Sequence, residues 1–132
     1  MKRVTAIIEK AADGQYSCYV PEMIGGYGLV GYGVTAREAM DDLQTSLAEV
    51  CEMEAAEGRS VPAIEFEYKY DMQSFFNRFD YLNITKIGER AGINSTLLRR
   101  YACGAAKAGQ KQYDKLRKVV EDCIADLQKA TF

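Results

Sequence analysis

The chain has 132 residues, of which 48% are hydrophobic and 27% are charged, and its formal net charge is −2. This length suits one domain or two very small ones, and the composition is globular rather than disordered or collagen-like. No apolar run approaches the roughly 20 residues that a membrane helix needs, and Met1-Lys2-Arg3 leads into an alternating strand rather than an apolar signal core. We therefore expect a cytoplasmic protein with no membrane partner.

Histidine is absent, and the four cysteines (Cys18, Cys51, Cys103 and Cys123) form no CxxC motif. The chain thus lacks the commonest metal ligand and general base, and buried reduced thiols are favoured over zinc or redox sites. We expect no cofactor, no metal and no catalysis, because the carboxylates have no spacing that converges on one site. A Mg²⁺-dependent nuclease stays open by residue type, although it needs two or more acids on adjacent strands.

The charge is divided unevenly along the chain. Residues 1–80 contain seven Lys/Arg and fourteen Asp/Glu, a net charge of −7, whereas residues 81–132 contain ten Lys/Arg and five Asp/Glu, a net charge of +5. This division indicates two modules, an acidic one for a cationic partner and a basic one for a polyanion.

The first half predicts three strands, a helix and a fourth strand. Residues 4–9 and 15–20 flank Asp13-Gly14, a hairpin turn signal, and residues 29–34 form a third strand. The capping-box spacing of Thr35 and Glu38 starts a helix that ends near Gly58, and residues 63–70 alternate as a half-buried strand. The helix has an apolar face (Ala36, Ala39, Met40, Leu43, Leu47 and Val50) and an acidic one that includes Asp41, Asp42 and Glu49.

The glycine-rich stretch Gly26-Tyr27-Gly28-Leu29-Val30-Gly31 matches the GxGxxG pattern of dinucleotide-binding proteins. In that fingerprint the last glycine opens a helix whose N-terminus holds the pyrophosphate. Here the helix begins several residues later, at Thr35. We therefore interpret the stretch as a connection that provides tight turns or a close approach of backbones.

The second half predicts a helix-turn-helix. Asn83 and Gly92 bound a helix over residues 84–91, and Asn94 and Gly104 bound another over residues 95–103. A short helix over residues 72–79 precedes them, and a long helix over residues 110–129 follows, with a predicted apolar face of Tyr113, Leu116, Val120, Cys123 and Leu127. Residues 86–118 contain nine Lys/Arg and two acids, as expected for phosphate contact. A plain helical hairpin with a solvated basic face is the alternative.

Residues 85–104 resemble the helix-turn-helix of phage-repressor-type (Xre/Cro-like) regulators, on the Ala91-Gly92-Ile93 turn, the polar start of the second helix and the closing glycine. The resemblance implies that base and phosphate contacts fall on Asn94, Ser95, Thr96, Arg99 and Arg100. We expect Lys107, which lies outside that helix, to contact phosphate.

The first half resembles the HicB antitoxins, on the segments Ile8-Glu9-Lys10, Asp13-Gly14-Gln15-Tyr16-Ser17, Val20-Pro21-Glu22-Met23, Gly33-Val34-Thr35 and Glu38-Ala39-Met40. The resemblance implies an α+β protein with two domains. Residues 1–71 would form a partial ribonuclease-H-like β-β-β-α-β domain that binds the toxin, and residues 72–132 an all-α helix-turn-helix domain that binds DNA and oligomerises.

An antitoxin of this kind neutralises a small basic mRNA-cleaving HicA-like toxin and represses its own operon by binding operator DNA as a dimer or tetramer. We take Asp41, Asp42 and Glu49 as the candidate toxin contacts. The alternatives are a stand-alone transcription regulator whose first domain senses a ligand or oligomerises, and a ribonuclease-H-like hydrolase. A reading frame for a small basic protein of roughly sixty residues next to this one would favour the antitoxin.

Overall fold

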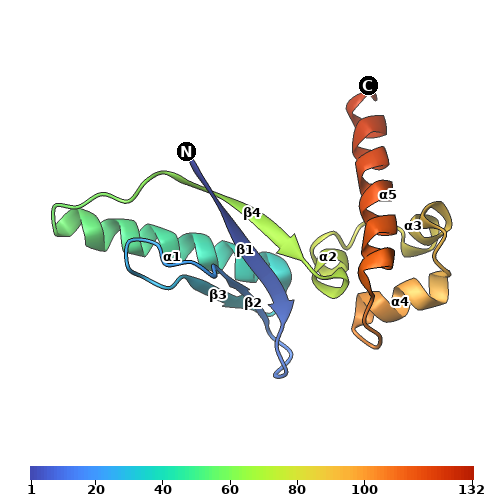
Figure 1. Cartoon of the computed structure of the whole chain (residues 1–132), viewed down its shortest axis with the longest axis horizontal. Helices are drawn as coiled ribbons and strands as arrows, with labels where there is room; N and C mark the ends of the chain where they lie inside the picture. Colours follow the sequence, from blue (N-terminus) through green and yellow to red (C-terminus); the bar gives the residue numbers. More distant parts are fainter. The chain divides into compact units, whose positions relative to one another are not determined.

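The structure is a computed structural model of residues 1–132, and the chain divides into two compact units, Met1–Arg78 and Phe79–Phe132 (Figure 1). The first unit holds a four-stranded sheet and two helices, and the second holds three helices. The prediction of a mixed α+β chain is confirmed at this level. The boundary lies later than the predicted one between residues 71 and 72, because helix α2 belongs to the first unit.

The sheet is built from β1 (Lys2–Lys10), β2 (Tyr16–Tyr19), β3 (Val30–Gly33) and β4 (Ile64–Tyr70), in the spatial order β3-β2-β1-β4. Strand β1 pairs antiparallel with β2, and β2 pairs antiparallel with β3. Strand β4 pairs parallel with β1, so that Lys2 lies opposite Ile64. The four predicted strands are all present, with bounds that differ by a few residues.

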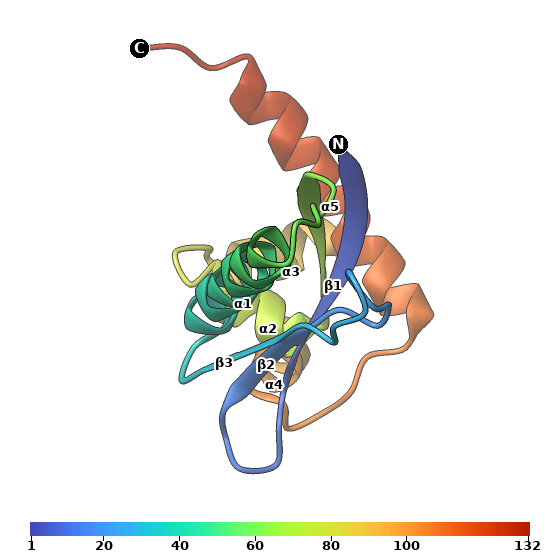
Figure 2. The same cartoon turned by 90° about the vertical axis from the view of Figure 1, so that its left-hand side faces the viewer.

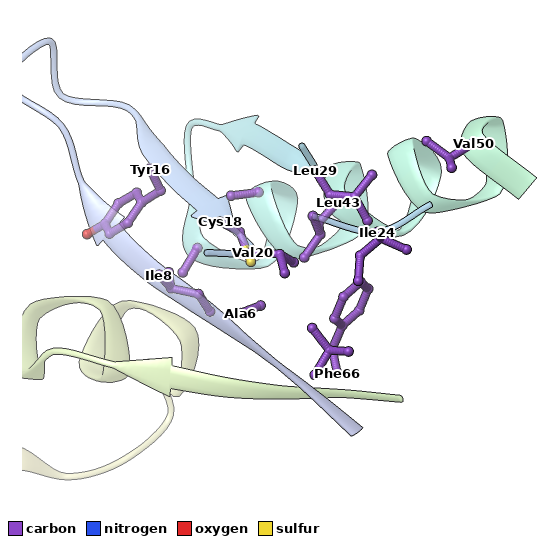
Figure 3. Close-up of a cluster of buried hydrophobic side chains, with 13 residues drawn as sticks. Ala6, Ile8, Tyr16, Cys18, Val20, Ile24, Leu29, Leu43, Val50 and Phe66 are labelled. Carbon is purple, nitrogen blue, oxygen red and sulfur yellow. The ribbon is translucent and has the colours of Figure 1, made fainter. Parts of the chain in front are cut away.

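Helix α1 (Ala36–Ala56) lies along one face of this sheet (Figure 2). The Thr35 hydroxyl accepts from the Glu38 backbone N–H at 3.2 Å, which is half of the predicted capping box. Side chains at helical spacing meet every second side chain of the strands and form the core (Figure 3). Leu43 from the helix and Cys18 from β2 are fully buried there.

Two glycines of β3 allow the helix to approach the sheet closely. A Cβ atom on Gly31 would lie 2.3 Å from the backbone oxygen of Ala39 and 2.3 Å from the backbone nitrogen of Leu43. A Cβ atom on Gly33 would lie 2.4 Å from the Cβ of Glu38. The predicted use of the glycine-rich stretch for close approach is confirmed, and Gly31 lies in a strand rather than at a helix start.

Helix α2 (Met72–Arg78) completes the first unit. Met72 and Phe76 are buried, and the hydroxyl of the fully buried Ser74 donates to the backbone oxygen of Ile8 at 3.2 Å. The side-chain oxygen of Asn77 accepts from the backbone N–H of Ala36, the first residue of α1, at 2.8 Å. These contacts tie α2 to β1 and α1.

The second unit consists of α3 (Ile84–Ala91), α4 (Ser95–Cys103) and α5 (Gln110–Gln128). The side chains of Asn83 and Asn94 cap α3 and α4, and Gly92 and Gly104 end them in the left-handed conformation. These predictions of helix starts and ends are confirmed. The helices share a core of Ile87, Ile93, Leu98, Tyr101, Leu116 and Val119.

Helix α5 differs from its prediction in the face that it buries. Leu116 is buried as predicted, but its buried neighbour is Val119 rather than Val120, and Leu127 is 71% exposed. The α3 and α4 helices reach only the first half of α5, so the apolar spacing of the second half covers nothing within the unit (Figure 1). The prediction of buried thiols holds only for Cys18, since Cys51 and Cys103 are exposed and Cys123 is half-buried.

Candidate functional site

The outward face of α4 carries the side chains that sequence analysis assigned to DNA. Leu98 and Tyr101 point into the core, whereas Thr96, Arg99 and Arg100 are exposed. Helical spacing places these three exposed residues on one side of α4. The structure therefore brings together two guanidinium groups and a hydroxyl on a single helix face.

The other predicted DNA contacts are placed differently. The side-chain oxygen of Asn94 accepts from the backbone N–H of Thr96 at 2.9 Å and of Leu97 at 3.4 Å, so this oxygen serves as a helix cap. Ser95 is half-buried at the first position of α4. Lys107 is exposed in the loop between α4 and α5, outside the exposed face of α4.

Thr85 is a residue of this face that sequence analysis did not single out. The Arg99 guanidinium donates to the hydroxyl of Thr85, which lies at the start of α3. This contact joins the two helices on the side where α4 is exposed and fixes the direction of the Arg99 side chain. A polar residue at the second position of the first helix was the available signal.

The three acidic residues proposed to contact a toxin lie on α1, but they do not have equivalent surroundings. All three are exposed. The Asp42 carboxylate accepts from the backbone N–H of Tyr32 on β3 at 2.9 Å, and helical spacing places Glu49 on the same side of α1. Asp41 points away from the sheet, nearly opposite the buried face. Asp42 therefore has a structural role, and Asp41 and Glu49 remain as acidic surface groups.

Asp42 belongs to a row of α1 side chains that closes the outer edge of β3. The Glu38 carboxylate accepts from the backbone N–H of Val34 at 2.8 Å, and the Ser46 hydroxyl donates to the backbone oxygen of Val30 at 3.0 Å. Positions 38, 42 and 46 are four residues apart on the helix, and their partners 34, 32 and 30 are two apart on the chain. Four helical residues and two strand residues both span about 6 Å, so the two rows match.

Within the first unit, no helix lies over the face of the sheet opposite α1 (Figure 2). Side chains that point to this face include Thr5, Ile7, Tyr19 and Tyr32, and Tyr32 is 57% exposed. Met23 in the loop after β2 and Val34 after β3 are also largely exposed. Apolar and aromatic side chains left in water mark a surface suited to a protein partner. The alternating pattern of the strands was the sequence signal for this face.

An ion pair between the buried Glu54 and the exposed Arg59 stabilises the C-terminal end of α1. Glu54 is buried, and Arg59 donates to both of its carboxylate oxygens, at 2.7 Å and 3.1 Å. The bidentate hydrogen bonds from Arg59 lower the pKa of Glu54. Sequence analysis did not find this ion pair, because the several acidic residues of the helix indicate an exposed acidic surface that would include Glu54.

Cys18 is the buried thiol of the first unit. Burial raises the pKa of the Cys18 thiol to about 12, so this cysteine is not a thiolate nucleophile at neutral pH. No three Cys, Asp or Glu side chains are grouped so as to hold a metal ion. No helix combines the length and apolar character of a membrane span.

The chain was compared with protein-family models, with curated proteins and with solved structures, and none of them matches it.

Proposed function

We propose that the chain is an antitoxin that neutralises a small, basic mRNA-cleaving toxin of the HicA kind and represses its own operon. One observation carries the proposal, namely the pairing of an acidic unit with a basic one. The unit Met1–Arg78 has seven Lys/Arg and thirteen Asp/Glu, a net charge of −6, and the unit Phe79–Phe132 has ten and six, a net charge of +4. Such units suit a cationic protein and a nucleic acid respectively.

The order and directions of the strands support the first half of the proposal. Three antiparallel strands, a helix and a fourth strand parallel to the first form the β-β-β-α-β arrangement that a partial ribonuclease-H-like domain would have. The exposed carboxylates of Asp41 and Glu49 would add to the negative charge that attracts a basic toxin from a distance. The open face of the sheet, on the other side of the unit from Asp41, would hold the toxin by apolar contacts.

The geometry of α3 and α4 supports the second half. Two short helices joined by a turn at Gly92, with Arg99 and Arg100 outward on the second helix, suit the insertion of α4 into a DNA major groove. Arginine is the side chain that most often reads guanine, through two hydrogen bonds. The Arg99 contact with Thr85 would hold this guanidinium ready in the free protein.

The DNA arm of the test uses the region upstream of the chain's own reading frame. Replacing both Arg99 and Arg100 with alanine should cost about 1–3 kcal/mol of specific binding at fixed salt while leaving the helical circular dichroism unchanged. The matched double variant Lys107→Ala/Lys111→Ala removes the same charge outside α4. It should lower the salt dependence of binding and weaken all DNA sequences alike. An Arg99→Ala/Arg100→Ala protein that binds the upstream DNA normally would rule out α4 as the recognition helix.

The toxin arm uses the small basic protein encoded next to this chain. Charge reversal by Asp41→Lys/Glu49→Lys should slow association more than it speeds dissociation, and raised salt should have the same effect. Glu57→Lys after the end of α1 together with Glu121→Lys in α5 is a control of equal charge, at two exposed residues. Asp42 is left unchanged because it holds β3.

The two arms separate the proposal from its main rival. A protein that binds its upstream DNA but neither binds nor inhibits the neighbouring protein would be a stand-alone regulator. Metal-dependent cleavage of RNA by the purified chain would instead indicate a ribonuclease-H-like hydrolase.

A further inference from the structure

The two outer edges of the sheet are finished in different ways. At β3, side chains of α1 bind the backbone oxygen of Val30 and the backbone N–H groups of Tyr32 and Val34. At the opposite end of the sheet, β4 has β1 on one side and no strand on the other. The edge at β4 is therefore the more open one for an additional strand.

The register of β4 identifies the backbone groups that face outward. The backbone N–H of Lys2 donates to the oxygen of Ala63, and Lys2 lies opposite Ile64. In a parallel ladder with this register, residues 63, 65, 67 and 69 bond to β1, and the backbone groups of Ile64, Phe66 and Tyr68 point away from it. These outward groups are those that another strand would bind.

The side chains of β4 also show an unfinished edge. Ile64 and Tyr68 point to the same face of the sheet as the buried Phe66, yet both remain half-buried because no strand lies beyond them. On the opposite face the strand carries Glu65, Glu67 and Lys69, all exposed. Charged residues on a free edge usually prevent pairing with other strands. A strand can still pair there when its own charges lie opposite charges of the other sign.

We propose that β4 pairs antiparallel with β4 of a second copy of the chain, about a two-fold axis at Tyr68. In this register Glu67 lies opposite Lys69 of the second copy, and Lys69 lies opposite its Glu67, so both charge pairs are attractive. On the other face Phe66 lies beside Tyr70 of the second copy, and Tyr68 lies beside its own counterpart. Shifting the axis to Glu67 places the two Glu67 carboxylates opposite each other, which disfavours that register.

The resulting dimer joins the two sheets into one. Its strand order is β3-β2-β1-β4 from one copy followed by β4-β1-β2-β3 from the second. Because identical patches meet, the interface closes on itself and leaves no free edge on either copy. The inference rests on β4 alone and does not depend on DNA or toxin binding. Any assembly through the second unit would be additional to it.

The test is the mass of the full chain by sedimentation equilibrium over a concentration series. Glu67→Lys places two lysines opposite two lysines, and Lys69→Glu places two glutamates opposite two glutamates, so each variant should weaken pairing about tenfold. The double variant Glu67→Lys/Lys69→Glu exchanges the charges and should pair as the wild type does. Glu57→Lys changes the net charge as Glu67→Lys does but lies after the end of α1, outside β4, and it should change pairing less than twofold.

A mixing experiment shows whether the two charges meet between copies. Glu67→Lys and Lys69→Glu chains should each dissociate alone and should associate when mixed, because each then offers the other the opposite charges. Assembly through the second unit would be common to all variants and would double every mass alike. A monomeric wild type, or equal dissociation constants for the wild type and both single variants, would overturn the proposal. Circular dichroism of each variant verifies that it is folded.

Discussion

Glu54 is buried, although its position in an acidic helix predicts that it is exposed. The other acidic residues of its helix are exposed, whereas Glu54 is buried, and Arg59 donates a hydrogen bond to each of its carboxylate oxygens. Because Arg59 follows the end of the helix, the pair holds the chain where α1 turns toward β4. The ion pair therefore links a helix end to the segment that must return to the sheet.

The lowered pKa of Glu54 predicts a pH dependence of stability. A carboxyl group whose pKa is lower in the folded state stabilises the fold above its ordinary value of 4.5, and this contribution is lost as the pH falls through the lowered value. Glu54→Gln should lower the melting temperature at about pH 7, and the difference from the wild type should shrink as the pH falls through the lowered pKa of Glu54. Thermal unfolding at several pH values measures both. Glu57→Gln, an exposed neighbour, should unfold like the wild type at every pH.

Gly31 supports a second prediction about a single residue. Gly31→Ala would place a methyl group 2.3 Å from the backbone of α1, and the helix would have to move away from β3. We expect a loss of about 3 kcal/mol in the free energy of unfolding, measured by denaturant titration. In the control Gly28→Ala, the nearest atom to the new Cβ is the sulfur of Met23 at 3.9 Å, so its stability should stay within about 0.5 kcal/mol. Equal stability of the two variants would contradict the close approach.

Sequence analysis predicted the purpose of the glycine-rich stretch but not which glycine serves it. Gly31 and Gly33 meet the helix, whereas Gly25 and Gly26 adopt positive φ angles in the loop. Both uses require glycine, so the residue type does not distinguish them. The distinction requires knowing which strand lies under α1. The same holds for Glu54, whose burial depends on a partner outside the helix.

At the scale of elements, the closed edge of β3 predicts different roles for two neighbouring acids. Asp42→Ala removes the acceptor for the Tyr32 N–H and should cost about 1 kcal/mol of stability, with faster amide exchange at Tyr32. Asp41→Ala, whose side chain points to water, should change stability by less than about 0.5 kcal/mol. Urea titration and hydrogen exchange of the two variants measure the difference. Unchanged exchange at Tyr32 in Asp42→Ala would show that the carboxylate does not hold the strand.

Helix starts and ends were the best-predicted features, because they depend on residues that are close in sequence. Asn83, Asn94 and Thr35 cap helices where the sequence indicates, and Gly92 and Gly104 end them. The buried face of α5 was predicted less well. Tyr113, Leu116, Val120, Cys123 and Leu127 keep one spacing along the whole helix, but only its first half has neighbours in the unit to pack against. Spacing alone does not show where the neighbouring helices stop.

At the scale of the whole molecule, the position of α2 predicts which fragments fold. A fragment of residues 1–78 keeps Met72, Ser74 and Phe76, which cover the sheet, whereas residues 1–71 lose all three. We expect the longer fragment to unfold cooperatively and the shorter one to lose at least about 3 kcal/mol, since buried side chains leave a cavity when removed. Circular dichroism during urea titration compares them. Equal stability would show that α2 adds nothing to the first unit.

The order of the strands in the sheet could not be predicted from the sequence, because strands that pair can lie far apart along the chain. The hairpin of β1 and β2 is signalled by the turn at Asp13-Gly14, but nothing near β1 or β4 indicates that Lys2 lies opposite Ile64. The position of Ser95, Thr96, Arg99 and Arg100 on one short helix capped by Asn94 was predictable from the sequence. Their individual roles were not, since Asn94 and Arg99 both have partners within the protein.

The parallel pairing of β1 with β4 also has a consequence for synthesis on the ribosome. Strand β1 is an interior strand of the sheet, yet β4 is made only after β2, β3 and α1 have emerged. At about 5–20 residues per second, one edge of β1 waits several seconds for its neighbour, a period in which another nascent chain can occupy it. Lys2 and Arg3 begin β1, and Glu9 and Lys10 end it, so that charges lie at both ends of this waiting edge. Slower translation of residues 20–70 would lengthen that exposure and lower the yield of folded protein.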